Sequence, residues 1–290
     1  MLERLKECKL CGEHDYWSLF TVKKTVSIVK CKGCGLLYVN PRLVEKECRE
    51  MYQPESYFKN KNVLLYGYDD YVKEEFLYRE LFSRRLDALE RFKPGGEILD
   101  VGCAAGFFLD VAQKRRWRTR GVELSAYASS YAREQFKLDV FTGMLDEAKF
   151  PPASFDVVVM DDVIEHVPDP LAVMREVHRI LKPGGIYSLN TPNAGGWLRK
   201  VMRRKWFHFK EDHLFYFSHA TMDRALRSAG FKPLQIKASG KVVTLRYLVG
   251  RMNHYSRRLA RFLDWLIGDM AFANRPFYLY IGEMVVYAQK

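Results

Sequence analysis

The most constraining feature of the chain is a turn of small residues between a strand and a helix. Residues 98–101 are an apolar run that predicts a buried strand, and residues 107–116 carry the apolar periodicity of a helix. The turn between them, from Gly102 to Gly106, contains only glycine, alanine and cysteine. Side chains this small let a ligand approach the backbone closely at the carboxyl end of a strand. The sequence therefore predicts a ligand-binding turn at the edge of an α/β sheet.

Strands and helices continue to alternate after this turn. Further strands are predicted at residues 120–123, 140–141, 155–160, 186–189, 232–237 and 278–288. Helices are predicted between several of them, at residues 126–136, 171–181 and 218–230. Alternation of this kind predicts the α/β class, with a parallel sheet and helices on both faces. We expect the last strand to close the sheet as an edge strand.

An acidic residue follows the turn where a nucleoside site would need it. Glu123 ends the second predicted strand, and its carboxylate can accept hydrogen bonds from both hydroxyls of a ribose. A dinucleotide dehydrogenase would instead need glycines where Ala104 and Phe107 stand. The turn therefore favours an adenosyl ligand without phosphates over a dinucleotide.

Several motifs together resemble those of the class I S-adenosylmethionine-dependent methyltransferases. Residues 100–106 look like the D-x-G-x-G-x-G motif of that family, with alanine at the middle glycine. Residues 154–170 are similar to the S-F-D-V-V … E-H-V-x-D-P signature of one branch, which includes quinone-pathway O-methyltransferases and methyltransferases of sugar and polyketide pathways. Residues 181–185, 212–214 and 229–231 also fit. The resemblance implies a Rossmann-like, seven-stranded methyltransferase sheet with helices on both faces.

The resemblance also implies a cofactor, S-adenosyl-L-methionine, and a set of residues that contact it. Asp100 and Gly102 would lie near its methionine part. Residues 143–146 would surround the adenine, with Asp146 or a backbone amide near the amino group; a plain polar loop is the alternative. The predicted cofactor-binding residues are Asp100, Gly102, Ala104, Gly106, Glu123, Leu124, Leu145, Asp146 and Asp161.

Methyl transfer to a hydroxyl needs a group that accepts the hydroxyl proton, and histidines near the strand ends are candidates. The predicted catalytic residues are His166, Glu165 and His213. His166 is the leading proton acceptor because an imidazole titrates near neutral pH. Alternatively, His166 braces its loop with Glu165 packed beneath it, and His213 is structural. Tyr57, Tyr66 and Tyr71 precede the sheet and either cover the cofactor or pack as ordinary aromatic residues.

Four cysteines near the start of the chain predict a zinc site. Cys8-x-x-Cys11 is followed after 19 residues by Cys31-x-x-Cys34, the spacing of a four-thiolate zinc knuckle. With all four ligands supplied by protein, a Zn²⁺ ion here would be structural. Four unligated thiols are the alternative. Cys48 and Cys103 lie outside the pattern and are expected to be small apolar residues.

The whole chain has a net charge of +12, and its positive charge is concentrated in the last third. Between Asp223 and Asp264 there is no acidic residue, and a second basic cluster lies at residues 199–205. Residues 242–270 predict one basic amphipathic helix. Its apolar stripe is Leu245, Leu248, Met252, Tyr255, Leu259, Phe262 and Leu266. We expect this stripe to contact an anionic membrane surface or, alternatively, to pack against protein, either within the fold or in a dimer.

These features divide the chain into three parts and define its expected function. We predict a zinc-binding module at residues 1–45, a helical connector at 46–93 and a methyltransferase domain at 94–290, with the basic helix as an insertion at about 242–270. Without an apolar leader or membrane span, we expect a cytoplasmic protein, peripheral to the inner membrane face if the helix binds lipid. The expected reaction is methyl transfer to a hydroxyl of a small-molecule, glycan or lipid-linked acceptor. An RNA or protein methyltransferase, for which nucleic acid would be a partner, and a non-catalytic cofactor-binding protein are the alternatives.

Overall fold

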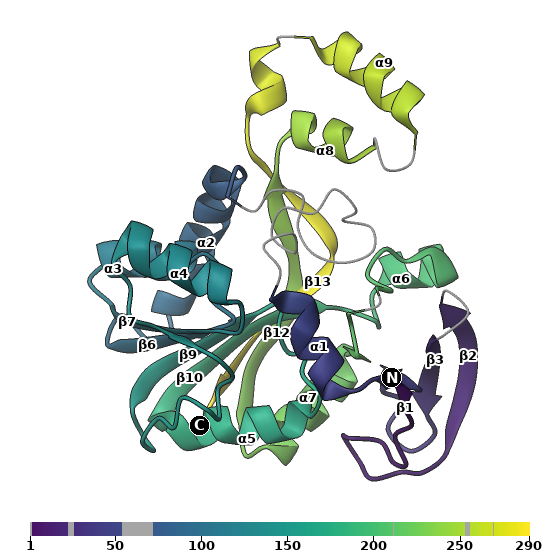
Figure 1. Cartoon of the computed structure of the whole chain (residues 1–290), viewed down its shortest axis with the longest axis vertical. Coiled ribbons are helices and arrows are strands. Elements are labelled where there is room, and N and C mark those ends of the chain that lie inside the picture. Colours follow the sequence, from purple (N-terminus) through teal and green to yellow (C-terminus); the bar gives the residue numbers. More distant parts are fainter. Residues whose placement is uncertain (1, 23–25, 54–71, 211, 253–255, 269) are drawn as a thin grey trace.

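A computed structural model of the chain describes residues 2–290 except 23–25, 54–71, 211, 253–255 and 269. A seven-stranded sheet in the order β12-β13-β10-β9-β6-β7-β8 forms its centre (Figure 1). The strands are β6 (Glu97–Val101), β7 (Arg118–Glu123), β8 (Val140–Thr142), β9 (Phe155–Asp161), β10 (Leu181–Pro192), β12 (Lys232–Val243) and β13 (Phe277–Gln289). This sheet confirms the predicted fold class.

Two kinds of strand pairing make up the sheet. Strands β6 to β10 pair in parallel, and a helix connects most of them, as parallel pairing requires. By contrast, β13 pairs antiparallel with both β10 and β12. The expectation that the last strand lies at the edge is therefore wrong, because β13 is hydrogen-bonded on both sides and β12 is the edge strand.

Helices cover both faces of the sheet. One face packs against α2 (Glu75–Glu90), α3 (Phe107–Lys114) and α4 (Ala126–Phe136), and the other against α5 (Pro170–Ile180) and α7 (His219–Ser228). Alternate residues of β9 show why: Val157 and Val159 join the first core, whereas Val158 and Met160 join the second. An apolar strand that is covered on both faces is what a central parallel strand requires.

The N-terminal module is a small sheet that shares a strand with the rest of the chain. Its elements are β1 (Leu2–Glu3), β2 (Tyr16–Val22), β3 (Val26–Cys31), β4 (Leu37–Val39) and β5 (Arg42–Leu43), followed by α1 (Glu45–Tyr52). The order of its four-stranded sheet is β11-β4-β3-β2, and β11 (Phe215–Tyr216) comes from much later in the chain. Residues 1–45 therefore complete their sheet with a strand from the methyltransferase part.

The region predicted as one long helix has a different structure. Strand β12 extends to Val243, where it pairs with Phe277, and two helices follow, α8 (Leu245–Met252) and α9 (Arg257–Ile267). Ser256 caps α9, since its side chain accepts a hydrogen bond from the Leu259 amide at 3.3 Å. The prediction of a single helix over residues 242–270 is therefore wrong, and Tyr255 of its stripe lies outside the described residues.

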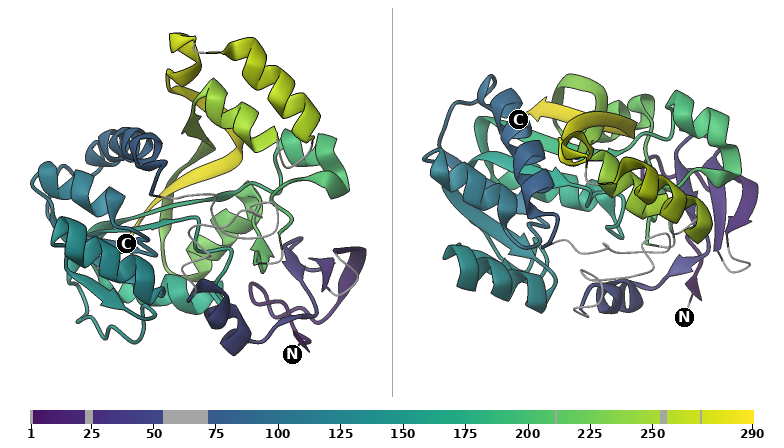
Figure 2. Two further views of the ribbon diagram at one scale, coloured as in Figure 1. Left: turned by 45° about the horizontal axis from the view of Figure 1, so that its top comes forward. Right: turned by 90° about the horizontal axis from the view of Figure 1, so that it is seen from above.

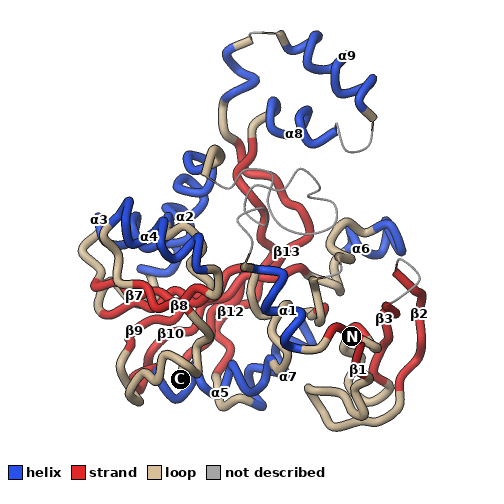
Figure 3. The backbone as a smooth tube through the Cα atoms, viewed as in Figure 1, coloured by secondary structure: helices blue, strands red, loops and turns tan. Residues whose placement is uncertain are grey.

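Helices α8 and α9 and the short helix η3 (Ala271–Asn274) form an arm at one end of the β12–β13 ribbon (Figures 1 and 3). Two further short helices, α6 (Trp197–Met202) and η2 (Arg203–Lys205), follow β10. Within the described ranges, no helix combines the length and apolar character that crossing a bilayer requires.

Candidate active site

A cavity of about 350 Å³ opens at the carboxyl edge of the parallel strands. Its wall comes from α1, the turn after β6, the end of β7, the loops after β8 and β9, and the first turns of α5. Ligands of open α/β folds bind at this edge because the loops there diverge. The predicted residues that line it are Gly102, Ala104, Glu123, Leu124, Leu145, Asp146, Asp161 and His166.

The turn after β6 has the tight backbone that its small residues predict. Gly102 has a φ of 79°, and a Cβ there would lie 2.4 Å from Cγ2 of Val163, so glycine lets the loop after β9 approach. Gly106 has a φ of 83°, and a Cβ there would lie 2.9 Å from Cβ of Ala132 in α4. Gly106 therefore serves close packing of the turn on α4 and does not itself line the cavity.

Glu123 lies at the end of β7 with its carboxylate held by the backbone. Oε2 accepts a hydrogen bond from the Ala104 amide at 2.8 Å, and Oε1 accepts one from the Ser125 amide at 2.7 Å. Burial raises the pKa of Glu123, and these two backbone hydrogen bonds oppose the rise. Each oxygen keeps a second lone pair, so the carboxylate can still accept a hydrogen bond from a ligand in the cavity.

The loop after β8 forms the next part of the wall, beneath α1. Leu145 is buried beside the cavity, whereas Asp146 is exposed at its rim. The carboxylate of Glu147 accepts a hydrogen bond from the Met144 amide at 2.7 Å and another from Arg49 at 2.8 Å. Helix α1 is thereby held against this loop.

A group of partly buried charges lies on the other side of the turn. Asp161, at the end of β9, pairs with Arg85 of α2, and Asp162 pairs with Lys241 of β12 at 3.1 Å. Asp100 lines a smaller cavity of about 40 Å³ beside Arg85. Burial raises the pKa of Asp100 well above its ordinary value, and the nearby charge of Asp161 adds to the rise.

His166 stands on the wall of the larger cavity with its ring orientation fixed. Nδ1 lies 2.7 Å from the backbone oxygen of Asp212 and 2.8 Å from the hydroxyl of Tyr52. A carbonyl oxygen only accepts hydrogen bonds, so Nδ1 carries the proton and Nε2 has the lone pair. Burial lowers the pKa of His166, with the Asp212 charge opposing, so the ring is neutral at pH 7.

The other two predicted catalytic residues lie behind His166. The carboxylate of Glu165, 1% exposed, accepts a hydrogen bond from the Thr191 hydroxyl at 2.9 Å. His213 is 5% exposed, and its ring centroid lies 4.6 Å from that of His166. One polar atom from each of these three residues lies within 4.8 Å of the others. Of the three, His166 lines the cavity, and Glu165 and His213 do not.

Sequence reasoning missed the side chains contributed by α1 and α2. Tyr52 and Arg49 of α1 line the cavity, and no pattern in the sequence connects them to it. Arg85 could have been found, because it lies four residues from Leu81 and from Leu89 and so shares their apolar helix face. Tyr57, Tyr66 and Tyr71 lie outside the described residues.

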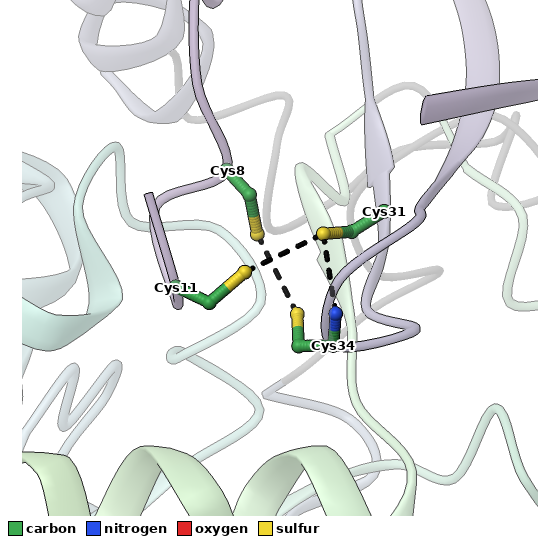
Figure 4. A group of neighbouring side chains, drawn as sticks. All are labelled: Cys8, Cys11, Cys31 and Cys34. Atoms are coloured by element: carbon green, nitrogen blue, oxygen red, sulfur yellow. Dashed lines mark hydrogen bonds between the residues drawn. The ribbon is translucent and has the colours of Figure 1, made fainter. Parts of the chain in front are cut away.

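The four predicted zinc ligands converge at one point of the N-terminal module (Figure 4). Sγ of Cys8 lies 3.7 Å from Sγ of Cys34, and Sγ of Cys11 lies 3.5 Å from Sγ of Cys31. Four sulfurs about 2.3 Å from a tetrahedral zinc ion would be about 3.8 Å apart. The Cys34 amide also donates to Sγ of Cys31 at 3.4 Å. The arrangement fits the ion.

Known proteins share both the sequence and the fold of this region. A family model described as a methyltransferase domain matches residues 73–236, more than half of the chain. A probable S-adenosylmethionine-dependent methyltransferase of Mycolicibacterium smegmatis is 34% identical over 100 residues, which are 34% of this chain and 39% of that protein. A ubiquinone biosynthesis O-methyltransferase of Idiomarina loihiensis is 28% identical over 182 residues, with 53% of this chain and 74% of that protein covered.

A solved structure agrees in fold. An S-adenosylmethionine-dependent methyltransferase from Archaeoglobus fulgidus matches with a TM-score of 0.53 and 18% identity, covering 76% of this chain and 99% of that one. The family match extends from α2 to β12 and includes the turn after β6, Glu123 and the loop that carries His166. The resemblance inferred from the motifs is thereby confirmed, and the chain belongs to the class I S-adenosylmethionine-dependent methyltransferases.

Proposed function

We propose that this protein transfers a methyl group from S-adenosylmethionine to a hydroxyl of a small-molecule, glycan or lipid-linked acceptor. The observation that carries the proposal is a single cavity with Glu123 on one wall and the neutral His166 on another. A relative named for O-methylation in ubiquinone biosynthesis supports a small hydroxylated acceptor.

The residues of the cavity fit the parts of the cofactor. The carboxylate of Glu123 would accept hydrogen bonds from the ribose hydroxyls, and Leu145 and Asp146 would border the adenine. Asp100 and Asp161, on the other side of the turn, would attract the ammonium group of the methionine part. Nε and Nη2 of Arg85 are buried without a hydrogen-bond partner among the described residues, so they remain available to a carboxylate.

The proposed reaction is an in-line displacement in which His166 takes a proton. The hydroxyl oxygen of the acceptor attacks the methyl carbon, the bond from that carbon to sulfur breaks, and S-adenosylhomocysteine leaves. Nε2 of His166 accepts the hydroxyl proton and later releases it to water, because Nδ1 is committed to the Asp212 carbonyl. Glu165 and His213 would act by holding the loop and ring of His166 in place.

We also propose that Cys8, Cys11, Cys31 and Cys34 bind one structural zinc ion. The distances between their sulfurs support it, and the bound ion would contribute folding energy to this small module. Thiolate ligands need a reducing compartment, so the cytoplasm is the proposed location. Elemental analysis of protein purified without added metal tests this, and a zinc content near zero in freshly reduced protein would contradict it.

A labelling experiment tests the proposed reaction. Purified protein is incubated with methyl-labelled S-adenosylmethionine and an extract separated into lipid, glycan, RNA, protein and small-molecule fractions. We expect label in the lipid, glycan or small-molecule fraction, and its loss with His166→Asn as the matched control. Label confined to RNA or protein would contradict the proposed acceptor class. Cofactor binding without labelling of any fraction would favour a non-catalytic binding protein.

A further inference from the structure

The arm formed by α8, α9 and η3 stands at the same edge of the sheet as the cavity. Pro192, the last residue of β10, pairs with Glu283 of β13. The β12–β13 ribbon continues past this point for several residue pairs, ending with Val243 opposite Phe277. The arm is therefore attached beyond the carboxyl ends of the parallel strands, and it projects from the body of the molecule (Figures 1 and 2).

One side of α9 is accounted for by packing within the arm. Ala260 and Ile267 are buried, and Leu263 is half-buried. Leu263 and Ile267 pack against Leu245 and Val249 of α8. This contact fixes the direction in which the remaining sides of α9 face.

A second side of α9, next to this contact, is apolar and exposed. Leu259, Phe262 and Leu266 are 44%, 56% and 54% exposed, and Trp265 is 76% exposed. The first three step by three and four residues, so they form one continuous stripe along the helix. Met270 and Phe272, which follow in the arm, are also about half exposed, at 49% and 54%. Clustered large apolar side chains on a surface mark a site of interaction.

The charges beside the stripe are positive. Arg257, Arg258 and Arg261 are exposed, and none of them forms an ion pair with a carboxylate in the part of the chain that the structure describes. Asp264 is the single acidic residue of α9, and it lies 3.5 Å from Arg246 of α8. Two such arms packed stripe to stripe would bring the arginines of both copies together, which disfavours a second copy as the occupant.

A second element at this edge has the same chemistry. In α6, Trp197 and Val201 are 60% and 70% exposed. The basic residues around them are Lys200, Arg203, Arg204 and Lys205, all exposed. None of these four forms an ion pair within the described ranges. Because α6 follows β10, it also lies beyond the carboxyl ends of the strands.

We infer that the outer face of α9, with α6 as a second contact, docks on an anionic lipid bilayer. The apolar stripe would enter the boundary between headgroups and acyl chains, Trp265 would lie at headgroup level, and the arginines would contact lipid phosphates. The cavity edge would then face the membrane, within reach of a lipid-linked acceptor. This inference goes beyond methyl transfer, and its test does not depend on activity.

Vesicle sedimentation tests the inference with the full-length protein. One set of vesicles contains phosphatidylglycerol mixed with phosphatidylcholine, and the other contains phosphatidylcholine alone. We expect sedimentation with the anionic vesicles, and less of it as salt increases. Reversing the charge of Arg257 and Arg258 together, as R257E with R258E, should weaken binding by on the order of 30-fold, since each basic residue near an anionic surface contributes about fivefold. The double variant Phe262→Ser with Trp265→Ser should weaken the apolar contribution to vesicle binding, which persists at high salt.

A matched control makes the charge effect specific. Arg175→Glu with Arg224→Glu makes the same change of net charge on α5 and α7, away from the arm, and should leave vesicle binding within about twofold of wild type. Circular dichroism checks that each variant folds. Absence of binding to anionic vesicles, or equal loss with the two charge variants, would overturn the inference. A dimer in light scattering that Phe262→Ser with Trp265→Ser converts to a monomer would overturn it as well, in favour of an interface between copies.

Discussion

The two sides of the cavity are built in different ways. The side proposed for adenosine comes from consecutive βα units between residues 98 and 146, and it relies on small residues and backbone amides that position Glu123. The side proposed for the acceptor combines α1 and the loop after β9, with residues 212–213 behind His166. It relies on side-chain contacts between distant segments, such as those of Tyr52 and His166.

This difference has a consequence for stability and function. Backbone hydrogen bonds within one segment form as that segment folds, so the adenosine side should tolerate damage elsewhere in the chain. The acceptor side depends on contacts between distant segments. For example, the Leu214 amide donates to the Glu165 carbonyl at 2.8 Å, and the Val39 amide donates to the Leu214 carbonyl at 2.9 Å. Changes in the N-terminal module can therefore reach the loop that carries His166.

The largest expected effect is loss of the acceptor side when the zinc site is broken. Cys31→Ser removes a proposed ligand of an ion that would contribute on the order of 10 kcal/mol to folding of the module. We expect methyl transfer to fall by at least about 100-fold, because β4 no longer supports β11 and the adjoining loop. Binding of S-adenosylhomocysteine, measured by calorimetry, should change by less than about fivefold. If activity and cofactor binding are lost together, the two sides are not separable.

The next effect separates chemistry from cofactor binding on the acceptor side. His166→Asn should lower kcat by about 10²–10⁴, the range for loss of a general base, with cofactor affinity unchanged. His213→Asn is the matched comparison, and we expect a smaller loss because His213 does not line the cavity. Steady-state kinetics with an acceptor from the labelling experiment measures both. Full turnover in His166→Asn together with loss in His213→Asn would reassign the base.

A smaller effect should appear at Asp100, where binding and stability oppose each other. Burial raises the folded-state pKa of Asp100 well above 3.8, so the folded protein holds a proton that the unfolded chain has released. The contribution of Asp100 to the free energy of unfolding is fully present below about pH 4. It is lost as pH rises through the folded-state pKa. The Asp100→Asn variant has no such proton to release, so we expect it to be more stable than wild type at pH 8 and about equally stable at pH 4.

The same variant should bind the cofactor more weakly, since an amide attracts an ammonium group less than a carboxylate does. Urea unfolding at the two pH values measures the first effect and calorimetry the second. A variant that is less stable than wild type at pH 8 would contradict the assigned cause, and unchanged cofactor affinity would remove Asp100 from the site.

The smallest expected effect is on the pH profile of the reaction. Burial lowers the pKa of His166 below its ordinary value of 6.5, so its neutral form, the proton acceptor, predominates at pH 7. We therefore expect kcat to be flat from pH 7 to pH 9 and to fall as pH drops through this lowered pKa. A kcat that keeps rising tenfold per pH unit above pH 7 would assign the proton to another group.

The sequence predicted which residues after β6 and β7 line the cavity, and it predicted the parts contributed by distant segments less completely. The turn at residues 102–106 and Glu123 were found because glycine and acidic residues follow predicted strands at short, regular distances. Gly106 was correctly placed in the turn, but its contact is with Ala132 of α4, and only packing in three dimensions reveals that. The position of His166 on the cavity wall was found from its place after β9.

The remaining differences come from contacts that no local pattern encodes. Tyr52 meets His166 across 114 positions of sequence, and Lys241 meets Asp162 across 79. The basic helix was predicted as one piece because its apolar period continues from Leu245 to Leu266. Pairing between β12 and β13 holds residues 242 and 243 in the sheet and overrides the helical pattern there.

Binding of the reaction product by Glu123 is the most direct test of the account. Calorimetry with S-adenosylhomocysteine should show one site per chain, and NAD should not bind. Glu123→Ala should weaken binding by roughly 1–3 kcal/mol, the scale of lost hydrogen bonds to a charged group. Glu123→Gln keeps the shape of the side chain, and its affinity for S-adenosylhomocysteine should lie between those of wild type and Glu123→Ala. Binding of NAD in place of S-adenosylhomocysteine, or equal affinities in wild type and Glu123→Ala, would contradict the assignment of this cavity to the methyl donor.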